Sequence, residues 1–261
     1  MKKFKRYLSG ELEQIEIRRY IVVMTGIFWG VIFLAWLGYP AEHKYSITTH
    51  TFSFLGSFNE EHSPQWWWLF SIAMLFWCFA GMVLAQYYRR RFSVLSVWAA
   101  WVGAILFMLG CLNIGLVAIF PDVRTVLSNG IRVTEIHEKV AIFAAAAFIL
   151  CIIWFGLLLL KDWLGNILFG KRRQLAHAGM LAPYICWLTV LFVGVYHLVR
   201  WEYIYAEKKA AATAAGLPFG SSWSEAMGTR YSFPLWENIL IYTLFIFLIW
   251  FAVTLSKEDS P

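Results

Sequence analysis

Apolar residues along this chain gather into six long runs instead of alternating with polar residues. Charged side chains are rare inside the runs and frequent between them. About 20 mostly apolar residues cross the hydrocarbon core of a bilayer, and each run has at least that length. The pattern predicts an all-α polytopic membrane protein whose six transmembrane helices form one bundle over residues 20–255. The expected spans are 20–39, 66–88, 94–120, 140–160, 179–199 and 235–255.

Composition supports this class and excludes others. Hydrophobic residues make up 60% of the chain and charged residues 15%, with a mean hydropathy of +0.61. Soluble domains are about 45–50% apolar and about 25% charged. A water-soluble globule and a disordered chain are therefore excluded. The net charge of +6 does not predict a nucleic-acid partner, because the basic residues lie beside the apolar runs.

The distribution of lysine and arginine along the sequence predicts the orientation of the chain in the membrane. Fourteen of the 22 lie in the N-terminal segment, the connections after the second and fourth runs, and the C-terminal tail. Positive charge marks the cytoplasmic side, so both termini are expected there. Residues 1–19 predict either an amphipathic cytoplasmic helix on the anionic leaflet or a basic segment that only sets the topology. Residues 256–261 predict a cytoplasmic tail. Because the sequence contains neither a glycosylation sequon nor a eukaryotic sorting motif, we expect the protein in a bacterial inner (plasma) membrane.

The fifth run continues into a sequence that favours helix. Residues 203–215 are rich in strong helix formers, and Gly216-Leu217-Pro218 provides a stop signal. A helix over 179–215 is about 55 Å long at about 1.5 Å per residue. It would extend beyond the outer face and could dock other membrane subunits.

Most of the remaining polar chemistry lies in the three outer connections, about 40–65, 121–139 and 200–234. Ionisable groups inside a span usually face the bundle interior or a wet cavity, which makes His197 and the neighbouring Arg200 informative. Thr134 is expected to cap the fourth helix, which places His137 at the mouth of the bundle. The candidate ligand-binding residues are His50, Ser53, Asn59, Asp122, His137, Glu138, His197, Arg200 and Glu202. No catalytic residue is assigned.

Hydroxyl and apolar side chains alternate over residues 48–59 in the first outer connection. Such alternation is compatible with a strand, but an isolated strand beside a helical bundle is weakly stabilised. We expect an ordered, partly helical amphipathic segment over the outer mouth.

Two stretches carry a resemblance to a known family. The first is Ser53-Phe54-Leu55-Gly56 with Pro64, and the second is Gly115 to Phe120-Pro121, followed by His137 and residues 141–148. The pattern resembles a prokaryotic six-helix membrane family of unknown function related to DRAM and GPI-remodelling (PGAP-type) membrane proteins. The resemblance implies a six-helix bundle with a functional outer rim and lipid handling. The extended fifth helix and the acidic turn at 59–62 depart from that pattern.

Three functions follow from these features. The first is lipid binding or remodelling at the outer leaflet, with Arg200, Arg230 and Arg132 available to a phosphate headgroup because guanidinium binds phosphate bidentately; it requires no cofactor. The second is an accessory subunit of a larger membrane complex. The third is a membrane enzyme that uses His50, His137 and His197 to bind a divalent metal, or haem b between His137 and His197. Whether the protein is an enzyme stays open.

Overall fold

The structure is a computed structural model, which describes residues 2–41, 45–58, 64–123, 125–128, 130–170, 175–217 and 230–256. Six of its helices are long and apolar enough to cross a membrane, which makes the chain an integral membrane protein. The described part is helical and contains only an isolated bridge between Val126 and Arg132 as extended pairing. The elements are α1 (Lys2–Ser9), α2 (Gln14–Leu37), η2 (Phe52–Gly56), α3 (Trp67–Phe92), α4 (Val97–Ile119), α5 (Val133–Phe169), η3 (Ala178–Met180), α6 (Leu181–Ala214) and α8 (Phe233–Leu255).

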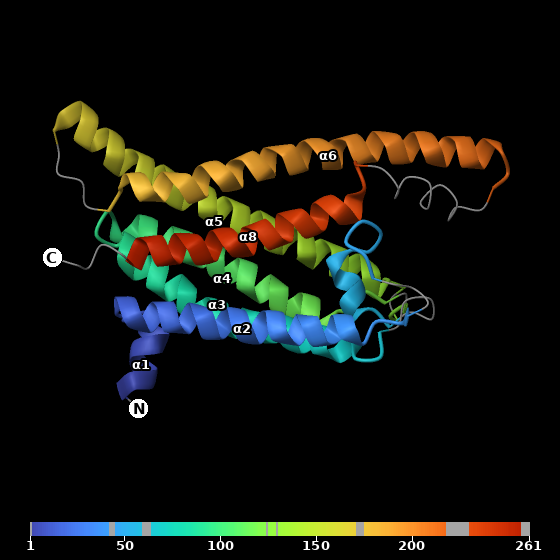
Figure 1. The fold of residues 1–261 in the computed structure, drawn as a ribbon, viewed down its shortest axis with the longest axis horizontal. Helices are drawn as coiled ribbons and strands as arrows, with labels where there is room; N and C mark the ends of the chain where they lie inside the picture. The colour runs from blue at the N-terminus through green and yellow to red at the C-terminus, as the bar shows by residue number, and fades with distance from the viewer. Residues whose placement is uncertain are drawn as a thin grey trace.

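The long helices run roughly parallel to one axis (Figure 1). Both ends of the described chain lie at the same end of the bundle, on the left in Figure 1. The opposite end holds η2, the start of α8 and the C-terminal part of α6, and we call it the η2 end. There α6 continues past the first turn of α8. At the other end, the last turns of α5 project beyond the bundle.

Small residues allow α3, α4 and α5 to approach one another closely. A Cβ at Gly81 of α3 would clash with the Cys111 sulfur of α4, and one at Gly103 of α4 would clash with the Phe155 ring of α5. Helices in membranes associate through such close packing, because lipid supplies no hydrophobic driving force between them. The glycines therefore explain why α4 packs directly on α3 and on α5.

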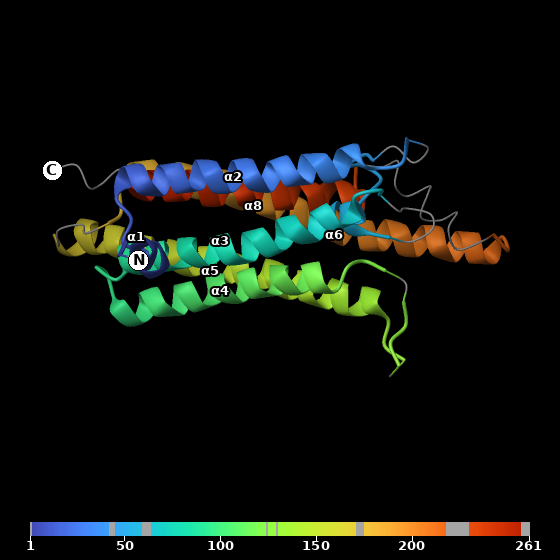
Figure 2. The same ribbon diagram turned by 90° about the horizontal axis from the view of Figure 1, so that it is seen from below.

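Aromatic side chains fill the larger space between α8 and the layer formed by α2 and α3. The Phe245 ring of α8 stacks on Phe28 of α2 with centroids 4.7 Å apart, and the Tyr88 hydroxyl of α3 donates to the Leu248 carbonyl over 2.9 Å. Figure 2 shows α2 and α8 side by side, away from α4. α6 packs on α8, where Leu240 covers Gly194.

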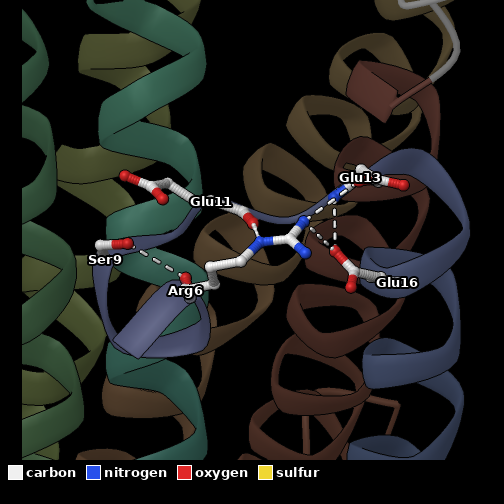
Figure 3. Close-up of polar contacts among 5 residues, drawn as sticks. All are labelled: Arg6, Ser9, Glu11, Glu13 and Glu16. Carbon is white, nitrogen blue, oxygen red and sulfur yellow. Dashed lines mark hydrogen bonds and ion pairs between the residues drawn. The ribbon is translucent and has the colours of Figure 1, made fainter. Parts of the chain in front are cut away.

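The N-terminal helix α1 turns away from the bundle axis (Figure 1). Gly10 permits the turn, with φ of +72° and no room for a Cβ against the backbone of Gln86 in α3. Arg6 then ties α1 to the start of α2 (Figure 3): its guanidinium lies 3.2 Å from Glu13 and 2.9 Å from Glu16. Since α2 begins at Gln14, residues 14–19 belong to the long helix and only 2–9 form a separate one.

Two expectations about α5 were wrong. Residues 161–169 were assigned to a connection, but α5 continues to Phe169 and ends where Gly170 adopts a left-handed conformation, which favours a helix stop there. Thr134 is not the N-cap, a position that Arg132 occupies. Its hydroxyl donates instead to the Val123 carbonyl over 2.7 Å, which ties the start of α5 to the end of the preceding connection. The partly helical segment expected in the first connection is the 3-10 helix η2.

Candidate functional site

Aromatic and basic side chains from α6 and α8 meet at the η2 end. His197 of α6 stacks flat on Trp236 of α8, with ring centroids 4.1 Å apart and an 8° angle between the planes. Tyr231, directly before α8, brings its ring centroid to 5.1 Å from the imidazole. The His197 Nδ1 atom is buried and has no hydrogen-bond partner among the described residues. We call His197, Arg200, Arg230, Tyr231 and Trp236 the α6–α8 cluster.

Two guanidinium groups converge on Tyr231 in this cluster. The Arg230 carbon Cζ lies 5.0 Å from the centre of the ring and the Arg200 Cζ 5.5 Å. Arg230 also donates a 2.9 Å hydrogen bond to the Tyr231 hydroxyl. That hydrogen bond, together with the charges of both arginines, lowers the pKa of Tyr231. The ion pairs of the described residues involve Arg6 and Arg90 and neither of these arginines, so their charge is available to an anion.

Local packing positions these groups. One turn beyond His197, Trp201 is buried, stacks on Tyr205 at 5.7 Å and packs against Phe233 of α8. The Trp236 indole donates to the Arg230 carbonyl over 2.7 Å, which holds the residues before α8 against its first turn. Arg200 and Arg230 themselves are exposed. The cluster therefore has a packed aromatic base and an accessible basic rim.

His50 and Ser53 belong to a different network, in which the segment before α3 is fastened to α8. Asn238 of α8 is fully buried and donates to the His50 carbonyl over 2.9 Å, while its own carbonyl oxygen accepts from the Tyr45 hydroxyl over 3.3 Å. The buried His50 ring lies 2.8 Å from the Thr49 hydroxyl through Nδ1. The Ser53 hydroxyl is 2.9 Å from that of Thr51. These contacts order the connection.

His137 and Asp122 lie near the junction of α4 and α5. His137 is buried, and its Nδ1 is 2.8 Å from the carbonyl of Phe120 at the end of α4. Asp122 is close enough to Glu237 of α8 for their carboxylates to interact electrostatically, and Glu237 accepts a hydrogen bond from the Phe52 backbone N–H. The Glu237 Oε2 atom is buried without a partner among the described residues.

The remaining candidates do not join the cluster. Glu138 and Glu202 are exposed on α5 and α6, and Arg132 is exposed at the start of α5. Asn59 lies outside the described residues. The structure thus brings together His197 and Arg200 and gives His50 and His137 separate partners. In the part of the chain that the structure describes, no group of three His, Cys, Asp or Glu residues is placed to hold a metal ion.

Sequence reasoning did not select Tyr231, Trp236, Glu237 or Asn238 as site residues. The sequence did contain an indication, because Glu237 and Asn238 are adjacent polar residues near the start of a largely apolar helix. Polar groups in such a helix need partners. What the sequence does not provide is the rotation of α8 that turns Trp236 toward α6 and Asn238 toward Tyr45.

The chain is therefore an integral membrane protein of the helical-bundle class. Compared with protein-family models, curated proteins and solved structures, it has no significant match.

Proposed function

We propose that this protein binds an anionic lipid at the outer leaflet through the α6–α8 cluster. The observation that supports this most strongly is the convergence of Arg200 and Arg230 on Tyr231, with no ion-pair partner among the described residues. Guanidinium groups bind phosphate oxygens through paired, charge-assisted hydrogen bonds. A phosphate between the two arginines would compensate charge that the described residues leave unbalanced.

The location of the cluster suits a lipid headgroup. Tryptophan and tyrosine concentrate where hydrocarbon meets water, and His197, Tyr231 and Trp236 form an aromatic base at one end of the bundle. Phe192 and Tyr196, on the preceding turns of α6, are exposed and available to an acyl chain. His197 Nδ1 adds a polar atom that could contact the headgroup.

The distribution of basic residues in the sequence supports an outer location for this end. Most lysines and arginines lie in the segments at the opposite end, near both termini, and the side richer in these residues faces the cytoplasm. The η2 end then faces the periplasm of a bacterial inner membrane. The resemblance to the DRAM and PGAP-type proteins points to the same class of function.

Lipid retention tests the proposal. The full-length protein would be reconstituted in nanodiscs with phosphatidylglycerol or with phosphatidylcholine, and retained lipid counted by native mass spectrometry. We expect preferential retention of phosphatidylglycerol. Arg200→Ala and Arg230→Ala should each weaken it by about threefold to tenfold, the range for one charge-assisted contact near a surface. Arg132→Ala, an exposed arginine at the same end but outside the cluster, is the matched control. Equal retention by all variants contradicts the proposal.

One observation favours a second candidate, an accessory subunit in a larger complex. α6 is the least buried of the six spans within this chain, and it continues past α8 at the η2 end (Figure 1). A partner helix could cover this exposed face. Native mass spectrometry of protein extracted in a mild detergent tests this candidate, which requires a stoichiometric partner protein.

A further inference from the structure

A hollow lies beside α8 and shares no lining residue with the α6–α8 cluster. It has a volume of about 600 Å³ and lies between α2, α8 and the segment before α3. Trp29, Phe33 and Trp36 line it from α2, Tyr242 from α8, and Tyr45 from the connecting segment. Volumes of about 300–1,000 Å³ are typical of small-molecule sites. We call this hollow the α2–α8 groove.

The lining of the α2–α8 groove is uncharged and largely aromatic. None of its residues is acidic or basic, in contrast to the α6–α8 cluster. A charged head group would lose its hydration there without gaining a counter-ion, which is costly. Aromatic rings also bind flat rings well, through offset or edge-to-face contacts. The occupant that fits is therefore neutral and planar at its polar end.

Two residues that line the α2–α8 groove, Trp29 and Tyr242, carry hydrogen-bond donors. On the α2 side, Trp29 packs its ring against Tyr242 at 5.4 Å, and its indole N–H donates to no acceptor among the described residues. The Tyr45 hydroxyl donates to the Asn238 side-chain oxygen and lies beside the Tyr242 hydroxyl, so Tyr242 is the tyrosine whose O–H can donate to an occupant. Burial raises the pKa of Tyr45 far above its ordinary value, so this hydroxyl keeps its proton.

A second polar atom on the same side of α2 also has no partner. Thr25 precedes Trp29 by one helical turn and therefore lies on the same face, and its buried hydroxyl makes no hydrogen bond with the described residues. Trp29 is eight residues from Leu37 at the end of α2, or about 12 Å along the helix axis. Trp29 therefore lies well inside the apolar span, away from the end of α2, whereas Thr25 does not line the groove.

We propose that the α2–α8 groove binds an isoprenoid quinone. A quinone ring is planar and uncharged, carries carbonyl acceptors on opposite edges, and lies inside the hydrocarbon region because its tail is apolar. One carbonyl accepts from the Trp29 indole N–H and the other from the Tyr242 hydroxyl, while the ring packs against the aromatic lining. The proposal is one of binding and includes no electron transfer. It does not depend on the anionic lipid, because Trp236 and Tyr242 face different elements.

Photolabelling of the full-length protein in nanodiscs tests the assignment. The probe is a short-chain azido-quinone, and labelled peptides are mapped by mass spectrometry. We expect labels in α2 and α8 that excess decylubiquinone removes and dioctanoylglycerol does not. Trp29→Phe keeps the ring and removes the donor, and should weaken labelling by about threefold to tenfold. Trp98→Phe, on an exposed face of α4, is the matched control and should leave labelling unchanged.

A blocking variant separates binding from folding. Ile47 lines the groove and is 38% exposed, so Ile47→Trp fills the hollow without disturbing the core. It should abolish labelling while phosphatidylglycerol retention stays as in the wild type. Labelling outside α2 and α8, or equal labelling of Trp29→Phe and Trp98→Phe, overturns the proposal. Displacement by dioctanoylglycerol as effective as by decylubiquinone also overturns it and assigns the groove to an acyl lipid.

Discussion

Asn238 connects the segment before α3 to α8, so Asn238→Ala should loosen the η2 end. The side chain is fully buried. Its amide donates to the carbonyls of His50 at 2.9 Å and Pro234 at 2.8 Å, and its oxygen accepts from Tyr45 at 3.3 Å. The bonds to His50 and Tyr45 join residues 188 and 193 positions apart in sequence, and the bond to Pro234 lies within α8.

The expected loss of stability follows from these contacts. Hydrogen bonds between elements of membrane proteins contribute about 0.6 kcal/mol on average and up to about 1.7 kcal/mol. Two such bonds give about 1–3 kcal/mol, and a buried His50 carbonyl left without a donor adds to this. We expect Asn238→Ala to lower the free energy of unfolding by about 2–4 kcal/mol.

Unfolding in mixed micelles with increasing sodium dodecyl sulfate measures this loss. Asn113→Ala is the matched control, because Asn113 also lies in a long apolar helix but donates only to Leu109 of its own helix, over 2.8 Å. It should cost less than about 1 kcal/mol. If the two variants unfold at the same detergent fraction, the buried network does not hold the η2 end together and the reasoning is refuted.

Three further variants test other parts of the account. Gly103→Ala should destabilise the protein by about 1–3 kcal/mol, because its Cβ would enter the Phe155 ring. Gly26→Ala, with open space around it, should stabilise α2 slightly. Equal unfolding midpoints for the two variants would show that close packing of α4 on α5 is unimportant. Arg6→Ala removes the contacts to Glu13 and Glu16 and should speed amide hydrogen exchange in α1. Lys5 is exposed, and Lys5→Ala should leave this exchange unchanged. Unchanged exchange in both variants would mean that other contacts hold α1. His197→Phe should keep the stack on Trp236 and most of the stability while lowering phosphatidylglycerol retention about threefold, and retention equal to that of the wild type would remove the imidazole from the proposed site.

Hydropathy was sufficient to predict the six long helices, because a run of about 20 apolar residues in water has few alternatives to burial in a bilayer. Boundaries were harder to predict. α5 starts before Thr134 and continues through Lys161 and Asp162 to Phe169, and nothing in hydropathy marks how far a helix continues once it leaves the apolar run. Gly170 was the available stop signal.

The candidate site was predicted only in part. His197 and Arg200 stood out because ionisable groups in a span need a reason to be there, and both lie in the α6–α8 cluster. Their partners Tyr231 and Trp236 come from another element, and which faces of α6 and α8 meet depends on tertiary packing around Gly194 and Leu240. The same limit explains why the separate partners of His50 and His137 were not predicted.

The most direct test of the central proposal is a nitrogen–phosphorus dipolar recoupling measurement by solid-state NMR. The protein would carry ¹⁵N-labelled arginine in phosphatidylglycerol bilayers, and the wild type would be compared with an Arg200→Ala and Arg230→Ala double variant. Our account predicts guanidinium nitrogens within hydrogen-bonding range of a lipid phosphorus in the wild type. The signal should be weaker in the double variant, because two of the twelve arginines no longer contribute to it. An identical signal in both proteins would contradict the account, because the phosphate contacts would then belong to other arginines.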